Sequence, residues 1–244
     1  GVLLTEAFNN TLTGVAVTDT RHAIVFSAWS AETGNSVSAE FINRDVNFHG
    51  SPDTGNIVHV AQGVLSYDTA IDPAVWSLVS TGGSNHAATD IWGRNAVRFA
   101  IGEGSSNVDT IYGADGGSYL NGHGSNDTLV GGSGGDVIIG GLRRDMITGG
   151  DGRDTFIFKM GDDLDTLTDM TFGAGGDTIV IMGNAAVDSL QDLVFTQDGA
   201  DLRVRYGSNS TIILKDTVIA DVDAGNFVFD PFSTTYADDW NGGL

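Results

Sequence analysis

Short apolar runs separated by polar turns extend along the whole chain. The runs before residue 100 cover four to six residues and are bounded by Gly, Asn, Ser or Asp. Runs of this length between turn-forming residues are typical of β-strands. The pattern predicts an all-β chain. For residues 1–100 it leaves open a sandwich or irregular coils that lead into the next segment. The expected strands there are 23–26, 36–41, 56–60, 75–79 and 96–99.

From Gly104 the pattern becomes strictly periodic. Every unit of nine residues begins with Gly and has a large apolar residue in its eighth position. Asp occupies the sixth position in five of the six units, and Ser118 occupies it in the other. A fixed period over several copies indicates a repeat architecture in which each unit packs only against its neighbours. The six units are GSSNVDTIY, GADGGSYLN, GHGSNDTLV, GGSGGDVII, GGLRRDMIT and GGDGRDTFI.

Each unit predicts a tight turn followed by a very short strand. Glycine allows backbone angles with positive φ, so the first six residues form the turn and point several carbonyl oxygens inward. The last three residues form the strand, whose central side chain faces one way. Two units then complete one coil of a flattened, right-handed parallel roll. The thin core between its faces is predicted to consist of Ile111, Leu120, Leu129, Ile138, Ile147 and Phe156.

The sixth-position aspartates predict a metal site. Carboxylates stacked at successive turns repel one another, and a divalent cation between the turns removes that repulsion. Carboxylate and carbonyl oxygens together form an all-oxygen ligand set suited to Ca²⁺.

The units resemble the GGxGxDxUx repeats of RTX proteins, a calcium-binding β-helix repeat. The resemblance implies that each Ca²⁺ lies between the turns of units n and n+2. One row then stacks turns 104–109, 122–127 and 140–145, and the other stacks 113–118, 131–136 and 149–154. The implied metal-binding residues are Asp109, Asp127, Asp136, Asp145, Asp154, Gly104, Gly122, Gly131, Gly134, Gly140, Gly149 and Gly152, with Asp115 in a supporting role.

The fourth position, which is Gly in the family, distinguishes the two rows. The second row keeps Gly there, whereas the first row has Asn107, Ser125 and Arg143. Arginine adopts left-handed backbone angles poorly, so we expect the weakest site beside Arg143.

The second row has better turn glycines but one carboxylate fewer. Ser118 replaces the sixth-position Asp, and Asp115 would substitute for it in part. We therefore expect the best-formed site between Asp136 and Asp154, and three or four ions in all.

The segment after the repeats predicts strands that close the roll. Asp-Thr-apolar triplets recur at 165–167 and 177–179, a hairpin is expected from 201–206 and 211–215, and a last strand at 224–229. This region resembles the ends of RTX exoproteins such as serralysin-like proteases and alginate-epimerase R-modules. In those families it carries an uncleaved signal for type I secretion. The expected division is 1–100 (N-terminal all-β), 101–158 (roll) and 159–244 (capping strands with a secretion signal).

Composition restricts the partners. The chain has 32 acidic and 11 basic residues, for a net charge of −21. Nucleic acid and anionic membrane surfaces would repel such a chain. Cysteine is absent, so a bound metal rather than a disulfide framework would staple the fold. The sequence shows neither a stretch of 18 apolar residues nor a signal-peptide pattern.

Three function classes remain. We rank first a calcium-binding module of an exported bacterial protein, secreted or at the cell surface, that folds on Ca²⁺ binding outside the cell. The second is an adhesin or polysaccharide-binding module, for which Trp29, Trp76 and Trp92 are candidate sugar-stacking residues. The third is the non-catalytic part of a polysaccharide-active enzyme. The HExxH motif of a zinc protease is absent, and we expect no catalytic site within this chain.

Overall fold

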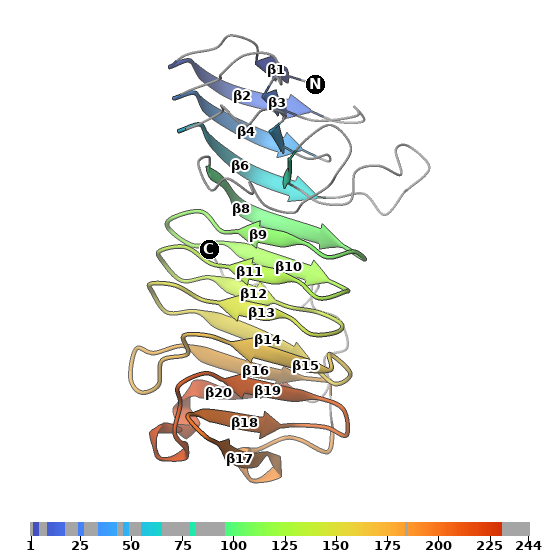
Figure 1. Cartoon of the computed structure of the whole chain (residues 1–244). Helices are drawn as coiled ribbons and strands as arrows, with labels where there is room; N and C mark the ends of the chain where they lie inside the picture. The colour runs from blue at the N-terminus through green and yellow to red at the C-terminus, as the bar shows by residue number, and fades with distance from the viewer. Residues whose placement is uncertain are drawn as a thin grey trace.

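The chain forms an all-β solenoid of stacked parallel strands (Figure 1). The computed structural model describes residues 2–4, 9–17, 24–26, 34–42, 46–48, 55–64, 79–81, 96–183 and 185–230. Within these ranges the only helical segments are three short 3₁₀ turns, and no helix is long and apolar enough to cross a membrane. The expected all-β parallel roll is therefore confirmed.

The repeat units supply alternate strands of two sheets. Strands pair in parallel with the strand two units further along, as Leu129 pairs with Ile111 and Ile138 with Leu120. This interval of eighteen residues is what one coil per two units requires. One sheet contains β9 (Thr110–Tyr112), β11 (Thr128–Val130) and β13 (Met146–Thr148). The other contains β10 (Tyr119–His123), β12 (Val137–Ile139) and β14 (Thr155–Lys159).

The predicted core lies between the two sheets. All six eighth-position side chains are fully buried, from Ile111 to Phe156. They belong to one continuous apolar cluster that runs from the N-terminal strands to the last coil. Because the eighth position faces inward in every unit, each coil contributes one residue from each sheet to this cluster.

The strands before the repeats join the same stack. β2 (Thr11–Val17), β4 (Ser36–Ile42), β6 (Ile57–Val64) and β8 (Ala96–Ser105) pair in parallel, and β8 then pairs with β10. A further sheet is formed by β1 (Val2–Leu4), β3 (Ile24–Phe26), β5 (Val46–Phe48) and β7 (Val79–Thr81). Most of the strand expected at 75–79 lies outside the described residues.

An asparagine ladder accompanies these N-terminal strands. The Asn35 side-chain oxygen accepts the backbone N–H of Asn10 at 3.0 Å and its side-chain NH₂ at 3.2 Å. Asn56 repeats this contact with Asn35 at 3.1 and 2.9 Å. An amide is both donor and acceptor, so it stacks on another amide without charge repulsion.

Irregular strands close the far end of the roll. β15 (Leu164–Leu167) and β16 (Thr178–Met182) extend the two sheets, as the Asp-Thr-apolar triplets predicted. The predicted hairpin is confirmed as β18 (Asp201–Arg205) and β19 (Thr211–Leu214), and β17 (Val194–Asp198) adds an unpredicted third strand.

The last described strand begins later than expected. β20 (Phe227–Asp230) is preceded by a 3₁₀ turn at Ala224–Asn226. The Asp223 carboxylate accepts the Gly225 N–H at 2.8 Å, and this cap holds the turn. Residues 231–244 lie outside the described part of the chain.

Candidate calcium-binding turns

The first row of aspartates forms a ladder along one edge of the roll. The backbone N–H of Asp109 donates to the Asp127 carboxylate at 2.7 Å, and the N–H of Asp127 donates to Asp145 at 2.8 Å. The N–H of Asp145 donates in turn to Asp165 at 3.0 Å. All four side chains are at most 3% exposed. The sequence-predicted members of this row are therefore brought together and buried.

The second row repeats the arrangement on the opposite edge. The N–H of Asp136 donates to Asp154 at 2.9 Å, and the N–H of Asp154 donates to Asp177 at 2.9 Å. Ser118 occupies the place of the first carboxylate and is fully buried. Asp115 is exposed, and no hydrogen bond of its carboxylate is seen among the described residues.

The first-position glycines are required for a different reason from the one expected. They do not adopt positive φ; instead, the sixth-position carboxylate of the same unit folds back over them. A Cβ on Gly122 would lie only 2.5 Å from a carboxylate oxygen of Asp127 and 2.5 Å from the carbonyl oxygen of Gly140, which is closer than van der Waals contact allows. The units with an Asp in the sixth position show the same close approach, and in the remaining unit the Ser118 hydroxyl approaches Gly113 instead. Gly at position one therefore makes room for the buried acid.

The fourth position carries the positive φ that the turn needs. Gly116, Gly134 and Gly152 have φ of 97°, 114° and 133°. In the first row Ser125 (φ 104°) and Arg143 (φ 97°) adopt the same conformation without the freedom of glycine. Left-handed backbone at such residues is strained. Two of the three first-row turns, those with Ser125 and Arg143, therefore store strain that the second-row turns avoid.

Burial and mutual repulsion raise the pKa of the stacked carboxyls. Burial, followed by the charges of Asp145 and Asp109, raises the pKa of Asp127 to about 8, although the Asp109 N–H opposes the rise. Burial likewise raises the pKa of Asp145 to about 6. For Asp165, burial and the Asp145 charge raise the pKa to about 9.

The second row behaves in the same way. Burial, then the charges of Asp136, Asp177 and Asp169, raises the pKa of Asp154 to about 7, against the opposing Asp136 N–H. Each row is thus a column of negatively charged carboxylates that are buried at the edge of the roll, where water screens them poorly. Such a column is stable when protonated or when a cation lies between its members.

Unsatisfied carboxylate oxygens in both rows show that a hard cation fits these two edges. One carboxylate oxygen of each of Asp127, Asp145, Asp154 and Asp165 is buried and has no hydrogen-bond partner among the residues that the structure describes. Orphaned buried oxygens are rare unless they serve a ligand. No group of three acidic or His side chains that could hold a metal occurs among the described residues. The further ligands would therefore be backbone carbonyls of the turns, a donor set that suits Ca²⁺.

Two members of the rows were missed from the sequence. Asp165 follows Asp145 by 20 residues, and Asp177 follows Asp154 by 23. These insertions displace both residues from the period of eighteen. Their Asp-Thr-apolar context was visible and is the signal that identifies them. A third acid, Asp169, accepts the N–H groups of Gly149 and Gly150 at 2.9 and 2.8 Å.

A comparison with known protein families identifies the repeats. The family model of the RTX calcium-binding nonapeptide repeat, which spans four copies, matches residues 103–138 and 130–165. No curated protein sequence matches the chain. Solved structures do match, in 27 chains.

One of these solved structures is the crystal structure of extracellular lipase LipA from Serratia marcescens, at 18% sequence identity and a TM-score of 0.45. The match covers 91% of this chain and 38% of that one, so the present chain spans well under half of the lipase chain. Residues 103–165 of the present chain are, by the family match, calcium-binding RTX nonapeptide repeats, and they form a parallel β-roll.

Proposed function

We propose that this chain is a calcium-folded module of an exported bacterial protein. The observation that supports it best is the pair of Asp rows, in which buried carboxylates with raised pKa values leave oxygens without a partner. At neutral pH without a cation these rows oppose the folded state. With Ca²⁺ between the turns they favour it.

Calcium then acts as the folding switch. Binding that requires the folded turns stabilises the folded state alone, and a free concentration of 100 times Kd adds about 2.7 kcal/mol per ion. Several ions along the two edges add to one another. In a calcium-poor cytosol the chain remains unfolded enough to be exported, and at the calcium levels outside the cell it folds.

The export route follows from the C-terminal resemblance. The strands after the roll resemble the ends of RTX exoproteins, in which an uncleaved signal is read by type I secretion. β20 contains the apolar run Phe227-Val228-Phe229 of that resemblance. We therefore assign the type I secretion apparatus as a partner, and the secreted or cell-surface compartment as the location.

A calcium titration tests the proposal. Circular dichroism of the full chain should show a gain of β signal between calcium-depleted buffer and millimolar Ca²⁺. The double variant Asp136→Ala/Asp154→Ala should raise the Ca²⁺ concentration at the midpoint. An unchanged β signal across the titration refutes calcium-driven folding, and an unchanged midpoint in the double variant refutes the assignment of the best site.

A second candidate function is binding of a polysaccharide. The tryptophans that sequence analysis offered for it lie outside the described residues.

A further inference from the structure

A second apolar cluster lies on the outer face of the sheet that contains β10, β12, β14 and β16. Successive side chains of a strand point to opposite faces of a sheet. Ile179 and Ile181 of β16 belong to the inner core. Val180 and Met182 alternate with them and therefore point away from that core. We call this cluster the outer stripe; its members are Val137, Ile139, Ile157, Val180 and Met182, with Tyr119 packed against them.

The outer stripe is buried although it lies on the outside of the roll. Ile139, Ile157 and Val180 pair in register across β12, β14 and β16, and each is at most 6% exposed. Val228 continues the same column on β20 but is 48% exposed. A column on one face of a sheet stays open from above unless another layer packs on it. A covering layer is therefore needed over β12 to β16, and it stops short of β20.

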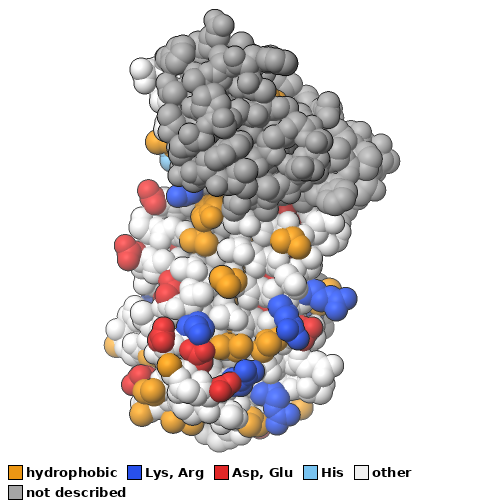
Figure 2. Space-filling model, viewed as in Figure 1, with side chains coloured by type: hydrophobic (Ala, Val, Ile, Leu, Met, Phe, Trp, Pro, Cys, Tyr) orange, Lys and Arg blue, Asp and Glu red, His pale blue; other side chains and the backbone are white. Residues whose placement is uncertain are grey.

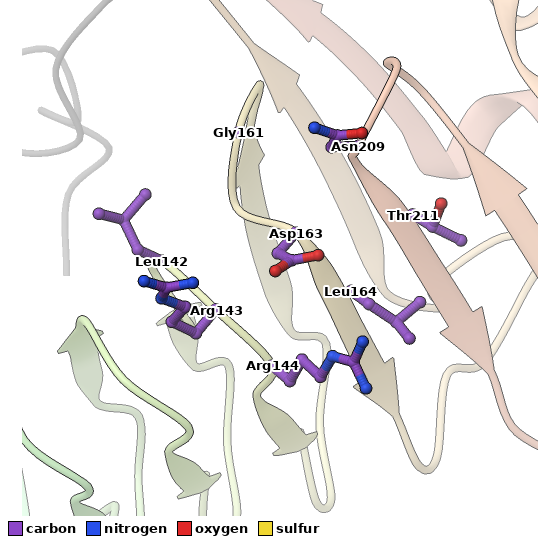
Figure 3. A pocket seen from close by; sticks show the side chains of 8 residues that line it. All are labelled: Leu142, Arg143, Arg144, Gly161, Asp163, Leu164, Asn209 and Thr211. Carbon is purple, nitrogen blue, oxygen red and sulfur yellow. The ribbon is translucent and has the colours of Figure 1, made fainter.

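The other sheet of the roll has a more open outer face. Met146 on β13 is 53% exposed. A pocket of about 480 Å³ opens where β13, β15 and β19 begin, with Leu142, Arg144 and Thr211 among its lining residues (Figure 3). On the face shown in Figure 2, apolar side chains lie scattered among polar and charged ones, as is usual for a protein surface. Among the described residues, an apolar cluster buried on an outer face occurs only on the sheet of β10 to β16.

The chain beyond β20 is placed and long enough to cover the outer stripe. β20 ends at Asp230 and pairs with β16, so residues 231–244 begin beside the stripe. Such a segment reaches up to about 46 Å when extended, at about 3.3 Å per residue. The distance across the sheet from β16 to β10 is about 14 Å, at about 4.8 Å between neighbouring strands.

The side chains of this segment match an apolar surface. Phe232, Tyr236 and Trp240 are spaced four residues apart. Residues an even number apart face the same side of an extended chain, so the three aromatic side chains share one face. Aromatic side chains bury large apolar areas. We propose that residues 231–244 lie as a strap across the outer face of β10 to β16, with this aromatic face on the outer stripe.

The strap gives the C-terminal segment two states. Its seat combines side chains of β10, β12, β14 and β16, which come together only when the coils stack. The segment is therefore accessible to a partner while the chain is unfolded and is withheld from that partner after folding. The strap does not depend on whether Ca²⁺ is the trigger of folding.

Oxidation of methionine by hydrogen peroxide, located by mass spectrometry, measures the cover over the outer stripe. The full chain is used at saturating Ca²⁺. Met182 lies in the outer stripe and Met170 in the inner core, and both are buried, whereas Met146 is exposed. In the unaltered protein Met146 should oxidise at least about tenfold faster than the other two, because oxidation follows exposure.

Replacing the aromatic residues of the strap should uncover Met182. In the variant Phe232→Ser/Tyr236→Ser/Trp240→Ser, Met182 should oxidise about tenfold faster than in the unaltered protein, while Met170 stays protected. A Met182 that stays protected in this variant overturns the proposal, because another part of the chain then covers the stripe.

Val180→Thr tests the same contact from the side of the roll and decides the proposal even where the triple variant unfolds and exposes Met170. Threonine is a good strand residue, and it replaces one methyl group of the outer stripe by a hydroxyl. Release of the C-terminal peptide by chymotrypsin at Tyr236 should become about fourfold faster.

Val228→Thr is the matched control, because Val228 lies in the same column but is exposed on β20. Its rate of peptide release should equal that of the unaltered protein. An unchanged rate in Val180→Thr, or an equal increase in both variants, overturns the strap.

Discussion

Replacing Asp127 with Asn should have opposite effects with and without calcium. The Asp127 side chain is buried, and one of its oxygens accepts the Asp109 N–H at 2.7 Å. The other oxygen has no partner within the described part of the chain. An amide keeps the shape and retains an oxygen for the Asp109 N–H. It removes the charge that burial and the neighbouring acids disfavour. The variant therefore separates the cost of the carboxylate from its use as a ligand.

The size of the stability change follows from the raised pKa of Asp127. The rise from 3.8 to about 8 sets an upper limit of roughly 6 kcal/mol, at about 1.4 kcal/mol per pKa unit. Solvent screening at the edge of the roll reduces this to about 1–3 kcal/mol near pH 8. In calcium-depleted buffer the Asp127→Asn protein should be more stable than the unaltered protein by that amount. In the calcium titration its midpoint should rise by about tenfold, because one charged ligand is lost.

Thermal unfolding followed by circular dichroism at pH 8 in calcium-depleted buffer measures the change in stability. The calcium titration at the same pH measures the change in the midpoint. Asp127→Ala should be less stable than Asp127→Asn by about 1–3 kcal/mol under both conditions, because alanine leaves the Asp109 N–H unsatisfied. Asp221→Asn is the control, since Asp221 is exposed and lies outside the repeats. A loss of stability for Asp127→Asn without calcium would refute the reasoning that the row is a column of disfavoured charges.

Three other expectations concern pH, the close-packed glycines and the asparagine ladder. The folded-state pKa values of about 6, 7 and 8 for Asp145, Asp154 and Asp127 exceed the ordinary 3.8. Their stabilisation is complete below about pH 4 and is lost as pH rises to about 8, so metal-free protein should melt higher at pH 5 than at pH 8; the reverse order would contradict this. Gly122→Ala should lower the free energy of unfolding, measured in urea with calcium present, by about 1–3 kcal/mol, because the added Cβ meets the Asp127 carboxylate. The control Gly124→Ala should change the free energy of unfolding little, because its Cβ has no neighbour closer than 3.9 Å. Asn35→Ala should lower the free energy of unfolding by about 1–3 kcal/mol and so lower the melting temperature, because it removes the ladder hydrogen bonds. The midpoint of the calcium titration should stay unchanged, since the ladder carries no charge. A shifted midpoint would show that the ladder is coupled to the calcium-binding turns.

Much of the roll was predictable because its signals are local and periodic. The eighth-position residues from Ile111 to Phe156 were placed in the core from their spacing, and all are fully buried. The hairpin at 201–215 followed from alternation around a polar turn. The N-terminal coils were less accessible, because the asparagines that mark them are separated by 25 and then 21 residues.

The rest of the site depends on contacts that no spacing reveals. Asp165 and Asp177 join the rows only because two insertions loop out and return the chain to register. The reason for glycine at the first position is a steric one, set by a carboxylate five residues later in the folded turn.

The sequence by itself determined the all-β class, the two-unit coil, the core residues and the oxygen-rich turns, since each follows from a fixed local period. Only the tertiary structure decided that the aspartates are buried, which of their oxygens lack a partner, and how far their pKa values rise. It also brought Arg143 and Arg144 against Asp163 and Thr211 to line one pocket. The physical reason is the same in each case: burial and proximity between segments distant along the chain arise only when the coils stack.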